Sequence, residues 1–289
     1  MRNAQGKAIS RTTGDRLTAP PRSKSLIASL GGRVMPGLRR IYSAVLVLVA
    51  WEILAIAIGD SLFLPRLSKV LGTIWAMLVS GQLAADSTVS LYRSLLGFVL
   101  AMCLGVPLGI LMGWFKRWDD FWSLLVSFSN PIPKIALVPL FLLWFGIGET
   151  SKVAVIAAGA FFPILINTYA GVHSVNPILT WRARTLGANE GEMLFKVILP
   201  AALPSIFTGA RLGMALAWVI LIAAEMVAAQ SGLGFRILYG QQMFETNVVF
   251  AGLLTISAFG FIFDRILQVM SQKVCGWHFR LSHGSEADN

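Results

Sequence analysis

Charged side chains inside apolar segments are the residues of this sequence most able to do chemistry. Glu225 and Lys134 each lie within a long run of apolar residues. A charged residue at the centre of a membrane-crossing helix costs about 2.5–3.5 kcal/mol of insertion free energy, so it needs a partner, water or a passing solute. Two roles stay open for Glu225. It either accepts hydrogen bonds from backbone freed before Ser231-Gly232-Leu233-Gly234, or it acts in a solute path or gate.

Lys134 and three further charged or polar groups have simpler interpretations. Lys134 either attracts an anion or pairs with an acid of the same helix bundle. Arg93 lies near the outer end of its apolar segment, where its side chain can extend to the membrane surface. We expect Glu52, which follows Trp51, to contact a partner or the interface, and His173 to lie at the interface as well.

The motifs of enzymes are missing from the sequence. It contains no His-Glu-x-x-His, no Gly-x-Ser-x-Gly and no phosphate-binding Gly-x-x-x-x-Gly-Lys-Ser/Thr. The two cysteines, Cys103 and Cys275, are too few and too far apart for a disulfide framework or a metal cluster. We therefore expect no catalytic residue, no metal and no cofactor on this chain.

The composition is that of a membrane protein. Only 13% of the 289 residues are charged and 56% are hydrophobic, whereas a soluble domain has about a quarter of its residues charged. A membrane-crossing helix takes roughly twenty apolar residues. Six segments meet this length and predict an all-α fold with six transmembrane helices: Ile41–Ile58, Leu91–Met112, Phe121–Phe145, Val153–Val172, Ile206–Ala229 and Val248–Lys273. The stretch Leu62–Gln82, broken by Pro65 and two basic residues, suits an interfacial helix instead.

Basic residues set the predicted orientation. With both termini in the cytoplasm, the inner segments hold eighteen lysines and arginines and the outer loops hold four, and nine of the eighteen precede residue 41. The positive-inside rule therefore places both ends in the cytoplasm. The net charge of +10 is then explained by a basic cytoplasmic tail, residues 1–40, that can touch anionic lipid, and nucleic acid is not an expected partner. The remaining domains are a transmembrane region over residues 41–275 and a cytoplasmic tail over residues 276–289.

Small residues recur at every fourth position in two of the predicted spans. They are Gly97, Ala101, Gly105, Gly109 and Gly113 in the second, and Gly209, Gly213 and Ala217 in the fifth. Such stripes let helices approach closely in lipid. We expect them to pack within the bundle, with a seam between two copies as the alternative. In the third span, Pro131, Pro133 and Pro139 predict a broken helix beside protein or water, which favours a pathway over a passive anchor.

The longest internal cytoplasmic loop, residues 173–205, contains a spaced pattern. Three residues separate Ala183 from Gly187, and nine residues separate Gly187 from a closing run that contains Val197, Leu199 and Pro200. We expect Asn176 and Pro177 to start a short helix, Gly187 to form a tight turn, a second short helix to carry an apolar face of Leu194, Phe195 and Val197, and Pro200 to start a new segment.

This pattern resembles the loop signature of permease subunits of binding-protein-dependent ABC importers, although Trp181 and Arg182 replace its first two residues. The runs 131–140, 143–148, 162–168 and 224–234 look like the subfamily that imports nitrate, sulfonates and taurine. The resemblance implies a type I importer fold in the bacterial inner membrane, with Ala183, Leu186, Gly187, Ala188, Val197, Leu199 and Pro200 forming the loop that couples to an ATPase. It also implies a second permease copy, two ATPase subunits that bind ATP and Mg²⁺, and a periplasmic or lipid-anchored solute-binding protein.

Two other classes of membrane protein fit the sequence less well. A self-powered transporter normally has two related halves, and no internal repeat is evident. A structural scaffold would not need the docking loop. Selectivity in such importers rests largely with the binding protein, so the sequence leaves nitrate, sulfonates, taurine and a pyrimidine precursor open as solutes.

Overall fold

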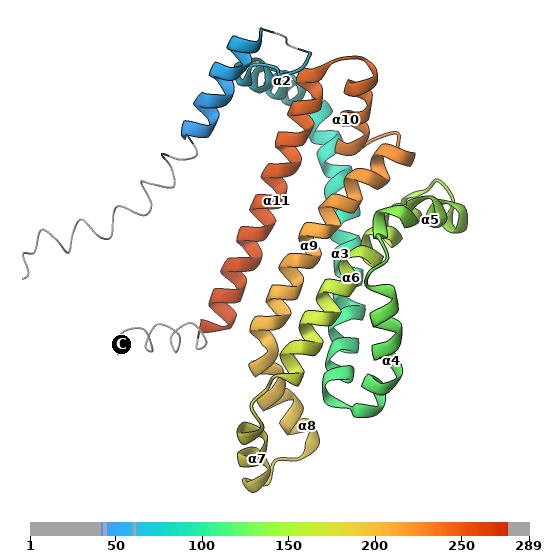
Figure 1. Ribbon diagram of the computed structural model, residues 1–289, viewed down its shortest axis with the longest axis vertical. Helices are drawn as coiled ribbons and strands as arrows, with labels where there is room; N and C mark the ends of the chain where they lie inside the picture. The colour runs from blue at the N-terminus through green and yellow to red at the C-terminus, as the bar shows by residue number, and fades with distance from the viewer. Residues whose placement is uncertain (1–41, 43–44, 60–61, 277–289) are drawn as a thin grey trace, which may run out of the picture. The chain divides into compact units, whose positions relative to one another are not determined.

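The computed structural model describes residues 42, 45–59 and 62–276 (Figure 1). It separates into two compact units, Met1–Ala50 and Trp51–Asn289. The described residues of the first unit are Tyr42 and residues 45–50, the latter forming the start of the apolar helix Val45–Ile58. The predicted tail 1–40 and all but the first residue of the predicted tail 276–289 lie outside the described residues. Within the described ranges, all regular structure is helical.

Three long helices form the centre of the second unit: α3 (Gln82–Trp114), α6 (Glu149–His173) and α9 (Leu199–Ala228). The predicted stripes of small residues explain how they pack. A methyl group on Gly109 of α3 would lie 2.8 Å from the carbonyl oxygen of Leu165, and one on Gly213 of α9 would lie 3.0 Å from that of Ala160. Both stripes therefore face α6, which lies between the other two helices, so the predicted packing within the bundle is confirmed.

A layer of three more helices covers this centre. Helix α11 (Thr246–Val274) packs on α9 and on α10 (Leu233–Gln242), and α2 (Leu67–Val79) packs on α11. Trp218 of α9 stacks on Phe259 of α11 with ring centroids 6.0 Å apart. Helix α2 has 13 residues, about 20 Å at 1.5 Å per residue, which is too short to cross about 30 Å of hydrocarbon.

Four of the described helical segments are long and apolar enough to cross a membrane: Gln82–Trp114, Glu149–His173, Glu190–Ala228 and Thr246–Val274. Of the predicted first span Ile41–Ile58, the continuous helix in the described part is only Val45–Ile58. The expectation of six spans with both ends in the cytoplasm therefore stays a prediction.

The predicted third span, Phe121–Phe145, is not one continuous helix. Helix α4 (Lys116–Ser129) ends before the prolines, and a second segment, the 3₁₀ turn η1 (Lys134–Leu137) with α5 (Val138–Phe145), leaves at 88° to it. Pro131 and Pro133 cause the break because each lacks the backbone N–H that a continuing helix needs, although Asn130 before Pro131 still has helical φ and ψ. Pro139 lies in the first turn of α5, where its missing N–H has no helical partner to lose.

Candidate functional site: the α7–α8 loop and the charges of the bundle

The loop between α6 and α9 begins with a capped helix. Helix α7 (Pro177–Thr185) starts where the side chain of Asn176 accepts a hydrogen bond from the backbone N–H of Ile178 at 2.9 Å. Pro177 takes the first helical position, for which its fixed φ is suited. The expected start of this helix is confirmed, and α7 and α8 lie together at the end of the bundle away from α2 and α10 (Figure 1).

Helix α7 ends in a glycine turn. Gly187 has a φ of +85°, a left-handed conformation that side chains disfavour. Its N–H donates to the carbonyl of Arg184 at 2.9 Å, and the N–H of Ala188 donates to that of Ala183 at 3.1 Å. A methyl group placed on Gly187 would meet no atom within 4 Å. The need for glycine here is therefore conformational, and the predicted tight turn is confirmed.

The second arm of the loop is not a separate short helix. Helix α8 (Glu190–Glu192), the π turn η2 (Met193–Ile198) and α9 run as one continuous helix of 39 residues, Glu190–Ala228. Pro200 lies in the first turn of α9 and starts no new segment. Pro200 cannot donate the usual i→i−4 backbone hydrogen bond. The wider π turn lies directly before it, which explains how the helix continues through this proline.

A capping box fixes the start of this long helix. The side chain of Asn189 accepts from the N–H of Glu192 at 2.8 Å, and the carboxylate of Glu192 accepts from the N–H of Asn189 at 3.2 Å. Lys196 donates to the same carboxylate at 2.8 Å, and these hydrogen bonds lower the pKa of Glu192. Arg184 reaches Glu190 at 3.1 Å and so links the two arms.

The predicted loop residues divide into two groups. Ala183, Val197 and Leu199 pack against a small core whose buried residues include Met193 and Ile198. Leu186, in contrast, is 87% exposed. Gly187 is also exposed, whereas Ala188 and Pro200 are half-buried.

Two large exposed side chains of this loop were missed as site residues. Trp181 and Phe195 are both 67% exposed. A groove of about 410 Å³ lies along α7 between Trp181 and Leu186. The departure of Trp181 from the loop signature was the available signal, because a large exposed aromatic residue is a common contact for another protein.

Glu225 lies in a buried network at the opposite end of the bundle. Its side chain is 1% exposed and accepts hydrogen bonds from Ser90 Oγ at 2.9 Å, from Arg93 at 2.8 Å and from the N–H of Gly234 at 2.8 Å. The last of these bonds fastens the start of α10 to the end of α9. This geometry favours the structural role for Glu225, and its role in a solute path stays a prediction.

Arg93 joins three parts of the chain, and the expectation that it extends to the membrane surface is wrong. The residue is 2% exposed. Its guanidinium donates two hydrogen bonds of 2.6 Å to Glu149 at the start of α6, one to Glu225 and one of 2.8 Å to the carbonyl of Ser231. Two carboxylates hold Arg93 in place. Glu149 makes a bidentate contact with the guanidinium, and Glu225 forms a buried ion pair with it, so both stabilise its positive charge.

A second ion pair extends this network. Asp86 of α3 accepts from Arg236 of α10 at 2.8 Å and from the N–H of Gly232 at 2.9 Å. Ser90 Oγ accepts from the N–H of Leu233 at 2.8 Å. The turn between α9 and α10 is thus held by side chains of α3 that lie about 140 residues earlier in the sequence, which no local sequence pattern indicates.

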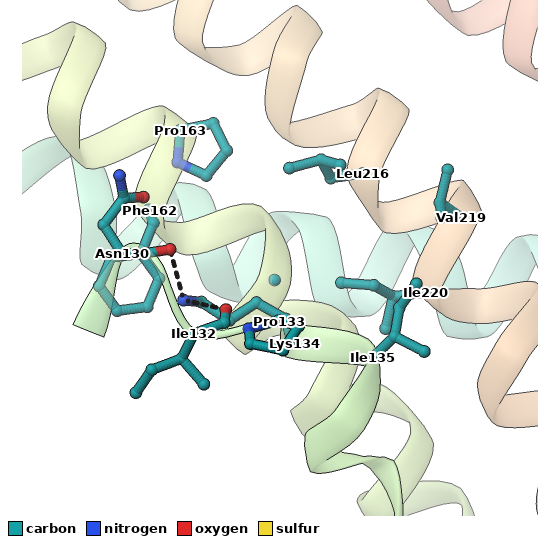
Figure 2. A pocket seen from close by; sticks show the side chains of 11 residues that line it. Asn130, Ile132, Pro133, Lys134, Ile135, Phe162, Pro163, Leu216, Val219 and Ile220 are labelled. Atoms are coloured by element: carbon teal, nitrogen blue, oxygen red, sulfur yellow. Dashed lines mark hydrogen bonds between the residues drawn. The ribbon is translucent and has the colours of Figure 1, made fainter. Parts of the chain in front are cut away.

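Lys134 lines a cavity of about 250 Å³ at the break between α4 and α5 (Figure 2). Its ammonium donates to the carbonyls of Ser129, Asn130 and Ile132, and it lies 4.2 Å from the centre of the Phe162 ring. The contacts of the described chain give it no acidic partner within 4 Å, so the ion pair, one of its two predicted roles, is not formed there. Its role toward an anion stays a prediction.

The two remaining polar candidates have local contacts. The carboxylate of Glu52 accepts from the hydroxyl of Ser68 at 2.8 Å and from its N–H at 3.3 Å, so it secures the first turn of α2. His173 stacks on Tyr169 with ring centroids 5.6 Å apart. Neither residue contacts the cavity beside Lys134.

Known proteins of one kind match this chain. Residues 105–275 match the family model described as the inner membrane component of binding-protein-dependent transport systems. A relative from Methanocaldococcus jannaschii that carries the name of an ABC transporter permease protein is 40% identical over 237 residues, covering 80% of this chain and 89% of its own. The taurine transport system permease protein TauC of Escherichia coli is 36% identical over 242 residues, covering 81% and 87%.

The fold also matches a solved structure. A chain of the inward-facing MetNI methionine ABC transporter superposes with a TM-score of 0.60 at 19% identity, and the match covers 68% of this chain and 97% of that one. The family model, the relatives and the fold agree with the loop pattern and the apolar helices. This protein therefore belongs to the family of inner membrane components of binding-protein-dependent transport systems, the permease subunits of ABC importers.

Proposed function

We propose that this chain spans the inner membrane and carries a small sulfonate, similar to taurine, into the cytoplasm, driven by ATP hydrolysis on a separate subunit. The observation that carries the proposal is the α7–α8 loop. It combines a rigid glycine turn with exposed Trp181, Leu186 and Phe195 at one end of the bundle. A packed loop with uncovered large apolar side chains outside the hydrocarbon is suited to contact another protein.

The two arms of the loop are suited to transmit force. Helix α7 is joined to α8 through the Gly187 turn and through the ion pair between Arg184 and Glu190. Helix α8 in turn continues without interruption into α9. A partner that moves α7 would therefore move a membrane-spanning helix directly, as an ATPase must do to drive transport.

The distribution of charge supports a cytoplasmic position for this loop. The basic residues of the α3–α4 turn, the α7–α8 loop and the end of α11 lie at one end of the bundle, and those of α2, α10 and the first turn of α6 lie at the other (Figure 1). The first group is larger, so the positive-inside rule assigns it to the cytoplasm. We propose six spans with both termini on this side, the break between α4 and α5 lying within the third.

The solute class rests on the relatives and on Lys134. The similarity to a taurine permease favours a sulfonate. The cavity beside Lys134 is otherwise lined mostly by apolar side chains such as Ile135 and Ile220, so no other charged side chain that lines it opposes the attraction of an anion to the lysine. We propose that it attracts the anionic end of the solute.

The proposed complex contains a second copy of this chain, two ATPase subunits that hold ATP and Mg²⁺, and an extracytoplasmic solute-binding protein. The name of the matching family, which states dependence on a binding protein, supports the last of these. A pathway between two copies also explains how the polar groups at the break of the third span avoid lipid.

Reconstitution tests this function. The chain is purified with its ATPase and binding protein, placed in vesicles, and assayed for ATP-dependent taurine accumulation. Leu186→Asp should remove the ATPase from the purified complex, because it places a charge at the most exposed apolar site of the loop. Phe244→Asp is the control, since Phe244 is also exposed but follows α10 at the opposite end. ATPase retained by Leu186→Asp, or wild-type vesicles that accumulate no taurine, would contradict the proposal.

A further inference from the structure

Helix α4 has two faces of opposite character. Asp119, Ser123, Ser127 and Asn130 follow one another at intervals of four, four and three residues and so share one face. Phe121, Leu124, Leu125 and Phe128 lie on the other, and all four are exposed. A polar face on a helix at membrane depth must meet protein or water, because hydrocarbon offers no hydrogen bonds.

A cavity lies against the polar face. Its volume is about 470 Å³, and it is lined by the four polar residues of α4 and by residues of α3 and α6 that include Tyr169. Asn130 also lines the smaller cavity beside Lys134. Asn130 thus borders both cavities, and the larger one continues along α4 for about 16 Å toward the end of the bundle where α7 and α8 lie (Figure 1).

Asp119 is the charged group of the larger cavity. Its Oδ2 accepts a hydrogen bond from the hydroxyl of Tyr169 at 3.3 Å, longer than the about 2.5–3.0 Å usual for two oxygens. Its Oδ1 is buried and has no hydrogen-bond partner in the described structure. A buried oxygen that accepts nothing is costly, so this carboxylate is ready to accept a hydrogen bond from a group that enters the cavity.

The two charges along this route have opposite signs. Lys134 is positive at the break, and Asp119 is negative nearer the α7 end. An anion without a cationic group would be attracted by the first and repelled by the second. A zwitterion avoids this conflict because its ammonium group can bind to Asp119.

Resting on the proposed transport function, we infer that the polar face of α4 lines the cytoplasmic half of the solute path and that Asp119 binds the ammonium group of an aminosulfonate. The ammonium would donate a hydrogen bond to the free Oδ1 of Asp119. Ser123 and Ser127, one and two turns further along, supply hydroxyl groups for the sulfonate oxygens.

Cysteine labelling tests the path without measuring transport. Single cysteines replace Ser123, Ser127, Leu124 or Leu125 in a chain whose native cysteines are serines, assembled in the full complex. A charged thiol reagent added at the α7 side should label the two serine positions and leave the two leucine positions unlabelled. Equal labelling of all four positions, or labelling of the leucine positions alone, would overturn the path.

The same label tests the role of Asp119. Taurine should slow the labelling of Ser123→Cys more than ethanesulfonate, which lacks the amine, by roughly tenfold, as expected for a hydrogen bond between charged groups. Asp119→Asn should abolish this difference and Asp120→Asn, at an exposed neighbouring residue, should preserve it. Equal protection by the two sulfonates, or a difference that survives Asp119→Asn, would refute ammonium binding. A complex that is labelled as expected but accumulates no sulfonate would refute the transport function and the solute class while leaving the path supported.

Discussion

Replacing Glu225 should destabilise the bundle in a defined order. Both carboxylate oxygens of Glu225 face only donors: one accepts from Arg93 and Ser90, and the other accepts from Gly234 N–H. A glutamine has one oxygen and one NH₂ group. In either orientation of its amide, the NH₂ group would face Arg93 or the Gly234 N–H, so Glu225→Gln should not be neutral, although it preserves size and polarity.

The magnitude follows from the number of donors that lose their acceptor. Glu225→Gln leaves one buried donor unpaired, which costs about 1–3 kcal/mol. Glu225→Leu removes all three hydrogen bonds and one charge of a buried ion pair, which costs about 3–5 kcal/mol. Glu149→Gln is the comparison, since the Glu149 side chain is 53% exposed. The effect of Glu149→Gln on stability should be smaller, because water reaches the side chain at position 149 and Arg93 keeps its ion pair with Glu225.

Thermal unfolding of the purified protein in detergent, followed by size-exclusion chromatography of the heated samples, gives the order of stabilities. We expect wild type and Glu149→Gln to be most stable, Glu225→Gln to follow and Glu225→Leu to be least stable. The reasoning would be refuted if Glu225→Gln unfolded at the wild-type temperature. If that variant also failed to transport, the charge of Glu225 would act in the path or gate instead.

Three further predictions concern the turn, the orientation and the packing. Gly187→Val should weaken ATPase binding because it forces a β-branched residue into left-handed backbone at about 1–3 kcal/mol, whereas Gly187→Asn should bind almost normally in the same co-purification assay; equal binding by both would contradict this. In a chain without native cysteines, Thr150→Cys should react with an impermeant thiol reagent outside intact cells and Glu190→Cys should not, and the reverse result would invert the orientation. Gly109→Ala should lower the unfolding temperature through its contact with the Leu165 carbonyl at about 1–3 kcal/mol, whereas Gly260→Ala, which meets no atom within 4 Å, should not.

The sequence predicted the features that depend on neighbours along the chain. The stripe that includes Gly109 predicted close helix packing, and Pro131 and Pro133 predicted a broken third span. Asn176 predicted the start of a helix. Each of these signals acts within one helix or turn, where residue type and spacing are enough to decide the outcome.

The sequence could not predict contacts between distant segments. Arg93 was expected to extend to the membrane surface because it lies near the outer end of its apolar segment, yet its partners Glu149 and Glu225 are 56 and 132 residues away. The continuous helix through Pro200 was also missed. A proline alone indicates a boundary, whereas the π turn before Pro200, held in place by Met193 and Ile198 in the small core, lets the helix continue.

The continuous helix from Glu190 to Ala228 has the geometry of a lever. Gly209 and Gly213, two positions at which it approaches α6 closely, lie near its midpoint, with roughly 28 Å of helix on either side. We expect this close approach to act as a fulcrum, because the glycines bring the two backbones together near the centre of the helix, where Ile164 of α6 lies over Gly213. A tilt of about 5° would move each end by roughly 2.5 Å, in opposite directions. If a partner moved the loop in one direction, the other end of the helix, with the charged network around Glu225, would therefore move in the opposite direction.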